Sequence, residues 1–281
     1  MRIIVSHDID HLFWHDHLFD TWWPGLYLRT IRQIVRGDIK YTVALRRLVT
    51  GKTLHNIPAL CDYLVENEIK STFFIGTGKG LNLSYSYKKA GPILDLIIKS
   101  GFEVGLHAIA YNDINRLTEE VKRFVEIAGF EPEGVRTHYL RFDQSTHEVM
   151  SQSGFKFDSS EYKVDHPQLR HNLWSVPISM MDVRVVQVND EKNLQAAKKR
   201  TFEILKSAHE AEIPFLVINF HDYFFSSAYP WHMAWFKWLI SELKTEKYEF
   251  ISFKDAVAIL NAEMHMEKID EMSPVYKDSI Q

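Results

Sequence analysis

The chain has 281 residues, of which 46% are hydrophobic and 25% charged, and its formal net charge is −4. This length and composition suit one large globular α/β domain, and the negative charge argues against a nucleic-acid partner. The single cysteine, Cys61, excludes an intramolecular disulfide, and no stretch is long and apolar enough for a transmembrane helix. Because the N-terminus also lacks a signal-peptide pattern, we expect a cytoplasmic protein.

The first predicted strand, residues 2–5, is followed directly by Ser6-His7-Asp8-Ile9-Asp10. β-favouring residues that lead into two carboxylates indicate a strand with ionisable groups at its C-terminal end, where the active sites of α/β barrels lie. On an extended segment the two aspartate side chains leave one face about 7 Å apart. One could hold a metal while the other accepts a proton from water. The alternative is a strand end covered by solvated acids.

Residues 11–54 interrupt the rhythm of the chain, and we interpret them as a helical insertion after the first strand, beside the mouth of the active site. Aromatic residues come first in this segment and basic residues follow: Trp14, Trp22, Trp23 and Tyr27, then Arg29, Arg32, Arg36, Lys40, Arg46, Arg47 and Lys52. Such a segment could dock on a membrane surface or on a phosphate-bearing, lipid-linked substrate. The alternative is that the aromatic residues pack the insertion onto the barrel while the basic residues are solvated.

After the insertion, short β-type runs alternate with amphipathic segments of helical length. The predicted strands are 2–5, 71–75, 102–106, 134–140, 155–158, 173–178, 215–220 and 249–252, and the predicted helices are 56–68, 90–100, 116–128, 144–153, 194–211, 231–245 and 253–262. This order predicts a parallel sheet covered by helices. Ionisable residues follow several different strands, which favours a barrel over a doubly wound sheet. We expect one domain over 1–263 and a polar C-terminal tail over 264–281.

The strand 102–106 delivers His107 to the same end of the sheet as the two aspartates. Gly105, two residues earlier, allows a close approach of neighbouring backbone. Carboxylate and imidazole ligands suit Zn²⁺, so Asp10 and His107 are two candidate ligands of a metal that keeps a position open for water. The alternative for His107 is a hydrogen-bonded structural histidine.

Two later strands carry further candidates. Arg136 and His138 share one face of 134–140 by period-two alternation, and a guanidinium beside Asp8 would lower the pKa of that acid and fix its orientation. His221 ends the buried strand 215–220 and precedes Asp222; a neighbouring carboxylate can raise the pKa of an imidazole, as a general acid near neutral pH requires. The alternatives are a surface ion pair for Arg136 and loop capping for the His-Asp pair.

The glycine-rich segment 76–80, Gly-Thr-Gly-Lys-Gly, is interpreted as a strand-to-helix loop. A phosphate-binding loop needs Gly-x-x-x-x-Gly-Lys-[Ser/Thr], and here a glycine follows the lysine. A serine-hydrolase Gly-x-Ser-x-Gly motif is also absent from the sequence.

In their order along the chain these motifs resemble those of the polysaccharide deacetylases, the NodB-homology or carbohydrate esterase family 4 group. The matching segments cover about 2–10 and 55–255, and they are Ser6-His7-Asp8-Ile9-Asp10, Ser71-Thr72-Phe73-Phe74-Ile75-Gly76, Gly101-Phe102-Glu103-Val104-Gly105-Leu106-His107, Arg136 and Asn219-Phe220-His221. The resemblance implies a distorted (β/α)₇-type barrel. It also implies a hydrolase of non-peptide C–N bonds, which removes an N-acetyl, or occasionally an O-acetyl, group from a sugar with the help of a metal.

Carried over residue by residue, the resemblance implies a role for each candidate. Asp8 would be the base that activates water, and Arg136 would orient it. Asp10 and His107 would be metal ligands, and His221 would protonate the leaving amine. A backbone N–H near Tyr139 could help to stabilise the oxyanion.

The chain departs from the family pattern at two places. The two aspartates are separated by one residue, and position 111, where the motif His-x-x-x-His has its second histidine, is Tyr. The third ligand of the metal, which we expect to be Zn²⁺, is therefore open; His138 is the leading candidate, followed by His11 and His7. The segment 136–142, Arg-Thr-His-Tyr-Leu-Arg-Phe, resembles a divergent subgroup associated with surface polysaccharide biosynthesis.

The expected substrate is an N-acetylated sugar or polysaccharide precursor. Two alternatives stay open: a metal-dependent hydrolase of another C–N bond such as a cyclic amide, and a catalytically inactive sugar-binding barrel. Asp158 and Trp174 could lie in the cleft, or could be an ion-pair member and a core aromatic residue. The sequence does not fix the oligomeric state.

Overall fold

The structure is a computed structural model that describes residues 1–49, 53–187 and 191–277, with side chains left out for 191–193 and 267–277. Within the described residues, one sheet contains the strands β1 Arg2–Ile9, β2 Ser71–Ile75, β3 Glu103–Ala108, β4 Gly134–Thr137, β5 Phe157–Asp158, β6 Gln168–Arg170, β7 Leu173–Ser175, β8 Met180–Met181, β9 Phe215–Asn219 and β10 Phe250–Ile251. The helices are α1 Trp22–Val35, α2 Tyr41–Leu48, α3 Ile57–Glu66, α4 Tyr87–Lys99, α5 Ile114–Ala128, α6 Thr146–Gln152, α7 Asp182–Val185, α8 Glu191–Glu210, α9 Pro230–Thr245 and α10 Phe253–Lys277, with 3-10 turns η1 Trp14–His17, η2 His138–Leu140 and η3 Asp222–Phe224.

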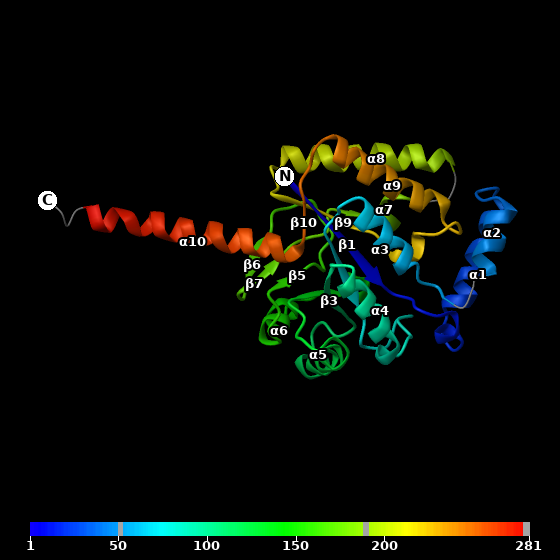
Figure 1. The fold of residues 1–281 in the computed structure, drawn as a ribbon, viewed down its shortest axis with the longest axis horizontal. Coiled ribbons are helices and arrows are strands. Elements are labelled where there is room, and N and C mark those ends of the chain that lie inside the picture. Colours follow the sequence, from blue (N-terminus) through cyan, green and yellow to red (C-terminus); the bar gives the residue numbers. More distant parts are fainter. Residues whose placement is uncertain (50–52, 188–190, 278–281) are drawn as a thin grey trace.

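The strands follow the order β6-β7-β5-β4-β3-β2-β1-β9-β8, with β10 beside β1. All neighbouring strands pair in parallel except β6 and β7, which are antiparallel. An isolated parallel bridge between Tyr162 and Ile178 joins the chain after β5 to the chain before β8. The sheet is therefore curled into a distorted, incompletely closed barrel with helices around it, which confirms the predicted fold class (Figure 1).

Alternation along the central strand separates two cores. Ile4 of β1 packs with Phe74 and Val217 in the cluster inside the curled sheet, whereas Ile3 and Val5 pack in the larger cluster between sheet and helices. Because side chains alternate with a period of two, Ser6 and Asp8 continue the inner face that Ile4 begins. The same alternation places His107 of β3, Arg136 of β4 and Asn219 of β9 on that face. The inner face of the barrel thus becomes ionisable toward the C-terminal ends of its strands.

Several predicted boundaries are wrong by a few residues, and three corrections matter for the site. The first strand extends to Ile9, so Asp8 lies within it and not after it. The strand predicted over 134–140 ends at Thr137, because Tyr139 and Leu140 have φ angles of 58° and 51°, which break extended structure. The short elements β6, β8 and α7 have no counterpart among the predicted elements.

The segment expected as an insertion contains η1, α1 and α2, which lie at one side of the molecule in Figure 1, in blue. At the opposite side α10 projects away from the barrel, and this helix continues over most of the tail predicted for 264–281. Residues 50–52 of the insertion and 278–281 of the tail lie outside the described part of the chain, and the division into domain and tail stays a prediction. No helix in the described part is long and apolar enough to cross a membrane.

Candidate active site

Asp10, His107 and His138 form a group that could hold a metal ion. The Oδ1 atom of Asp10 lies 3.2 Å from Nε2 of His107 and 3.2 Å from Nδ1 of His138, and these two ring nitrogens are 3.0 Å apart. Three ligands of a tetrahedral zinc ion, each about 2.0–2.2 Å from the metal, lie roughly 3.3–3.6 Å from one another. The three atoms therefore have nearly the mutual spacing of a zinc ligand set.

In each of the two histidines, the outer ring nitrogen, which faces away from Asp10, determines whether the inner nitrogen, which faces Asp10, can bind a metal. Nδ1 of His107 lies 3.1 Å from the carbonyl oxygen of Arg136, and Nε2 of His138 lies 2.9 Å from that of Leu81. A carbonyl oxygen only accepts, so each outer nitrogen carries a proton, and in the neutral ring each inner nitrogen therefore presents a lone pair. Two facing lone pairs and the unpartnered, buried Oδ1 of Asp10 form a negative focus that a cation would stabilise.

Strained backbone holds His138 in place from two sides. Tyr139 and Leu140, directly after this histidine, have positive φ angles, and so do Leu81 and Asn82, whose loop supplies the accepting carbonyl oxygen. A non-glycine residue in this region costs about 1–3 kcal/mol, and such strain concentrates at ligand clamps and active sites. His138 thus reaches the metal group from a turn, and not from the strand on which the sequence pattern places it.

Asp8 is buried beside this group in a network of hydrogen bonds. Its Oδ1 accepts from Nη1 of Arg136 at 2.8 Å, and its Oδ2 accepts from Nδ2 of Asn219 at 2.8 Å. Nη1 of Arg136 also donates to Oδ1 of Asn219 at 2.9 Å, and the rest of the guanidinium donates to Ser159. The arginine lies where the sequence pattern predicts it, next to Asp8.

The surroundings of Asp8 keep it ionised although it is buried. Burial alone would raise its pKa, but the charge of Arg136, followed by those of His107 and His221, outweighs burial and lowers the pKa of Asp8 below its ordinary value. The guanidinium also lies over the ring of Phe74, with 4.3 Å between its carbon and the ring centroid. The acid is therefore held in one orientation and ready to accept a proton.

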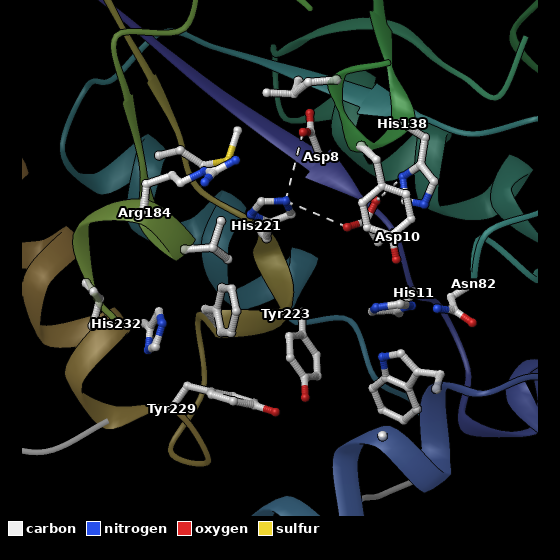
Figure 2. Close-up of a pocket in the computed structure, with 18 of the residues that line it drawn as sticks. Asp8, Asp10, His11, Asn82, His138, Arg184, His221, Tyr223, Tyr229 and His232 are labelled. Carbon is white, nitrogen blue, oxygen red and sulfur yellow. Dashed lines mark ion pairs between the residues drawn. The ribbon is translucent and has the colours of Figure 1, made fainter. Parts of the chain in front are cut away.

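His221 faces both aspartates across the cleft (Figure 2). Its Nε2 atom lies 3.7 Å from Oδ2 of Asp10 and 4.0 Å from Oδ2 of Asp8. On the other side, Nδ1 of His221 donates to Oδ1 of Asp182 at 2.9 Å, and its backbone N–H donates to Oδ2 of the same residue at 2.6 Å. Burial lowers the pKa of His221, but Asp182 more than offsets burial, and the pKa rises to about 10.

Asp182, and not the sequence neighbour Asp222, is thus the carboxylate that contacts His221. Oδ2 of Asp222 accepts instead from the backbone N–H of Asn56 at 3.0 Å, and its Oδ1 is buried without a partner. Burial, followed by the charge of Asp10, raises the pKa of Asp222 to about 8. No sequence signal points to Asp182, because it follows a strand of two residues, too short to show alternation.

These residues lie at the base of a cleft with a volume of about 1250 Å³. Its walls are rich in aromatic side chains: Trp22, Tyr139, Phe142, Tyr162, Tyr223 and Tyr229. In Figure 2 Tyr223 lies between His11 on one side and Tyr229 with His232 on the other. Small-molecule sites commonly occupy about 300–1,000 Å³, so this cleft has room for more than one sugar ring.

We compared the sequence and the fold with those of known proteins. No family model matches the chain. A solved structure from Mycobacterium smegmatis assigned as a polysaccharide deacetylase superimposes with a TM-score of 0.63 and 16% identity, over 93% of this chain and 90% of that one. This chain has the fold of the polysaccharide deacetylases. The chitin deacetylase structure from Colletotrichum lindemuthianum has a TM-score of 0.50 and 14% identity, over 90% of this chain and 85% of that one.

A curated chitin deacetylase from Colletotrichum lindemuthianum is 28% identical to this chain over 131 residues. The match covers 41% of this chain and 51% of the relative, so it spans about half the length of that protein. Together with the structural neighbours, this relative confirms the resemblance to the polysaccharide deacetylase family.

Within this deacetylase fold, the two other histidines considered as metal ligands have different surroundings. His7 alternates with Asp8 and points outward, where its ring packs against Phe73 with 4.6 Å between centroids. His11 lines the cleft, but its Nδ1 lies 3.1 Å from Nε2 of His17. His17 in turn donates from Nδ1 to Asp20 at 2.7 Å. The Asp20–His17–His11 chain, which the sequence pattern does not reveal, orients a cleft residue next to Asp10.

Asp158 and Trp174, the two further residues considered for the cleft of the deacetylase fold, have structural surroundings. Asp158 is fully buried, accepts from Ser160, and lies 3.6 Å from His147. Trp174 is half-buried and donates from its indole nitrogen to Asn261 at 2.8 Å. Neither residue lines the cleft, so their surroundings agree with the alternative of a structural role for each.

The glycine-rich loop 76–80 also packs structurally. A Cβ atom added to Gly78 would lie 2.7 Å from the carboxylate of Glu120, which accepts hydrogen bonds from the backbone of Ile109 and Ala110, both at 2.8 Å. The glycine is therefore needed because Glu120 approaches the loop closely. Since Glu120 braces the loop after β3, this contact supports the position of His107.

Because His7 is buried in its neutral form, we expect the stability of the folded chain to decrease in acid. Burial lowers the pKa of His7 to about 3, although its bond to the carbonyl oxygen of Phe220 opposes the shift. Because the unfolded chain binds this proton near pH 6.5 and the folded chain does not, stability should fall as pH drops from 6.5 toward 3, by up to about 1.4 kcal/mol per unit. His7→Asn, which keeps a donor near Phe220, should flatten the pH dependence of the urea midpoint between pH 7 and pH 4.5.

His11 and His232 also have lowered pKa values, so a residual slope is expected in this variant. The comparison is made on the slope and not on absolute stability, because the smaller side chain leaves a cavity. An unchanged slope in His7→Asn would show that His7 does not contribute.

Proposed function

We propose that this chain is a metal-dependent deacetylase that hydrolyses an N-acetyl group on a sugar or polysaccharide precursor. The observation that carries the proposal is that one ring nitrogen of His107 and one of His138 converge with a carboxylate oxygen of Asp10, in a cleft that also contains Asp8 and His221. Relatives described as polysaccharide and chitin deacetylases support the same reaction. Zinc is the metal that best suits one carboxylate and two imidazoles.

A bound zinc ion would polarise the acetyl carbonyl group and lower the pKa of water. Asp8, ionised and oriented by Arg136, accepts the proton of the water that attacks the carbonyl carbon. His221, kept protonated by Asp182, donates a proton to the amine nitrogen as the C–N bond breaks. The products are acetate and the free amino sugar.

The cleft supports a sugar over a small cyclic amide as substrate. Aromatic rings such as Trp22, Tyr139 and Tyr223 offer flat apolar faces on which sugar rings stack, and the volume of about 1250 Å³ exceeds the need of a small amide. Surface polysaccharide biosynthesis and a cytoplasmic location stay predictions from the sequence. The catalytically inactive sugar-binding barrel differs from the proposed enzyme in its metal content.

Metal content tests the proposal most directly. Protein purified without chelator should contain close to one equivalent of zinc by elemental analysis and release acetate from N-acetylated oligosaccharides. Asp10→Ala, His107→Ala and His138→Ala should each lose most of the metal and the activity, because each removes one of three ligands. His147→Ala, which removes a buried histidine that does not itself line the cleft, is the matched control and should keep both the metal and the activity.

A wild-type protein that takes up no metal, even after added zinc, would favour the inactive sugar-binding barrel. Metal uptake without acetate release would leave the hydrolase of another C–N bond as the better alternative. Normal metal content in His138→Ala would show that the third ligand lies elsewhere.

A further inference from the structure

The two helices of the insertion leave apolar side chains in solvent. On α1 these are Leu28, Ile31 and Val35, which are spaced as on one face of a helix. On α2 they are Tyr41 and Leu45, and Val49 directly follows that helix. Val35 is 81% exposed, Tyr41 76% and Leu28 70%. We call these six residues the apolar face of the insertion. On the surfaces of monomeric proteins, exposed apolar side chains normally occur singly. Their concentration on two adjacent helices therefore indicates an interaction surface.

Positive charge surrounds this apolar face. The segment 22–49 contains six basic residues and one acidic residue, although the whole chain has a net charge of −4. Arg32, Arg36, Lys40 and Arg46 are exposed. None of these four forms an ion pair with a residue that the structure describes. The free cations call for an anionic partner.

The positive charge also distinguishes between two possible partners of this surface, a second copy of the chain and an anionic membrane. In a two-fold dimer the same surface of each copy meets its mate, which would bring the four arginine and lysine side chains against their own counterparts. An anionic lipid bilayer satisfies both features at once, because aliphatic side chains enter the boundary of the acyl chains while the cations contact phosphate groups. Helices with this division of side chains lie in the plane of a membrane interface.

We propose that α1 and α2 dock the protein on an anionic membrane surface through the apolar face and its flanking cations. The insertion is firmly joined to the cleft: Arg47 of α2 is buried, donates to Gln33 of α1 at 2.6 Å, and lies 4.5 Å over the ring of Tyr229 in the cleft wall. Trp22 and Leu26, on the face of α1 opposite to Leu28, line the cleft. Membrane contact at the apolar face would therefore leave the cleft on the other side of α1, at a distance of one helix diameter (~10–12 Å) from the lipid headgroups.

The consequence for the substrate rests on the proposed function. A cleft held this close to a membrane surface suits an N-acetylated sugar that is attached to a lipid of that membrane. The lipid-docking step itself does not depend on metal or catalysis, so the two can fail separately.

Vesicle co-sedimentation of the full chain tests the docking. Wild type should bind vesicles of phosphatidylcholine mixed with phosphatidylglycerol and bind pure phosphatidylcholine much less, with a loss of binding at high salt. Leu28→Gln with Val35→Gln should lower the partition coefficient by about tenfold or more, and so should Arg32→Glu with Arg36→Glu. Neither pair lines the cleft, so acetate release from a soluble oligosaccharide should not change.

Matched controls come from exposed positions on other elements. Val65→Gln removes an exposed apolar side chain from α3, and Lys122→Glu with Lys254→Glu makes the same change in net charge on α5 and α10. These controls should bind vesicles like wild type. Absence of wild-type binding to anionic vesicles, or equal losses in test and control variants, would overturn the proposal. So would a wild-type dimer by light scattering that Leu28→Gln with Val35→Gln converts to a monomer without any change in vesicle binding.

Discussion

Asp8→Asn is expected to keep its bound metal and to lose about 10²–10⁴ of kcat, the range that a general base contributes. Asparagine has nearly the same shape as aspartate, so Arg136 still finds an acceptor, but the amide cannot take a proton from water. The structure gives Asp8 and Asp10 different surroundings. Both carboxylate oxygens of Asp8 accept hydrogen bonds from Arg136 and Asn219, whereas Asp10 faces the two histidines. Acetate release and zinc content are measured on the same preparation.

Asp10→Asn is the matched comparison, since it makes the same substitution at the end of the same strand. It should lose the metal together with the activity, because a neutral amide is a poor ligand for zinc. Loss of metal in Asp8→Asn would make Asp8 a ligand, and unchanged kcat would remove it as the base. A melting temperature close to that of wild type is required for either interpretation, because the Asn219 amide group must adjust to the new side chain.

Period-two alternation along the strands predicts much of this site. The expectation that strand ends meet at one edge brings together Asp8, Asp10, His107, Arg136 and His221, and the structure places all five in or beside one cleft. The prediction works because β1, β3 and β9 are long enough to show their apolar pattern, and parallel strands have their carboxyl ends on the same side.

The parts that the sequence does not reveal depend on irregular backbone. Alternation places His138 on a strand, but that strand ends at Thr137, and the histidine meets Asp10 and His107 from the turn that follows. Its position depends on left-handed backbone at Tyr139 and Leu81, and residues of these types give no sign of such a conformation. Asp182 escapes prediction because it follows β8, a strand of two residues that is too short to show alternation.

Asp182→Asn should lower kcat strongly, whereas Asp222→Asn should hardly change it. The first variant should lose about 10²-fold or more of kcat with its metal retained, because the imidazole of His221 loses the carboxylate that fixes its tautomer and favours its protonated form. The loss should fall on kcat more than on KM, since the proton is delivered in the transition state. Asp222→Asn should stay within about threefold of wild type, because its side chain accepts from the backbone of Asn56 and does not contact the imidazole.

The pair is informative because both carboxyl groups are buried, and because Asp182 contacts His221 in space whereas Asp222 follows it in sequence. A general effect of replacing a buried carboxyl group would weaken the two variants equally, whereas support of one imidazole nitrogen would weaken only Asp182→Asn. A large loss in Asp222→Asn alone would restore the His-Asp pairing expected from the sequence. Equal small effects would mean that proton donation does not depend on the contact between Asp182 and His221, and the activity of His221→Ala then tests the imidazole itself.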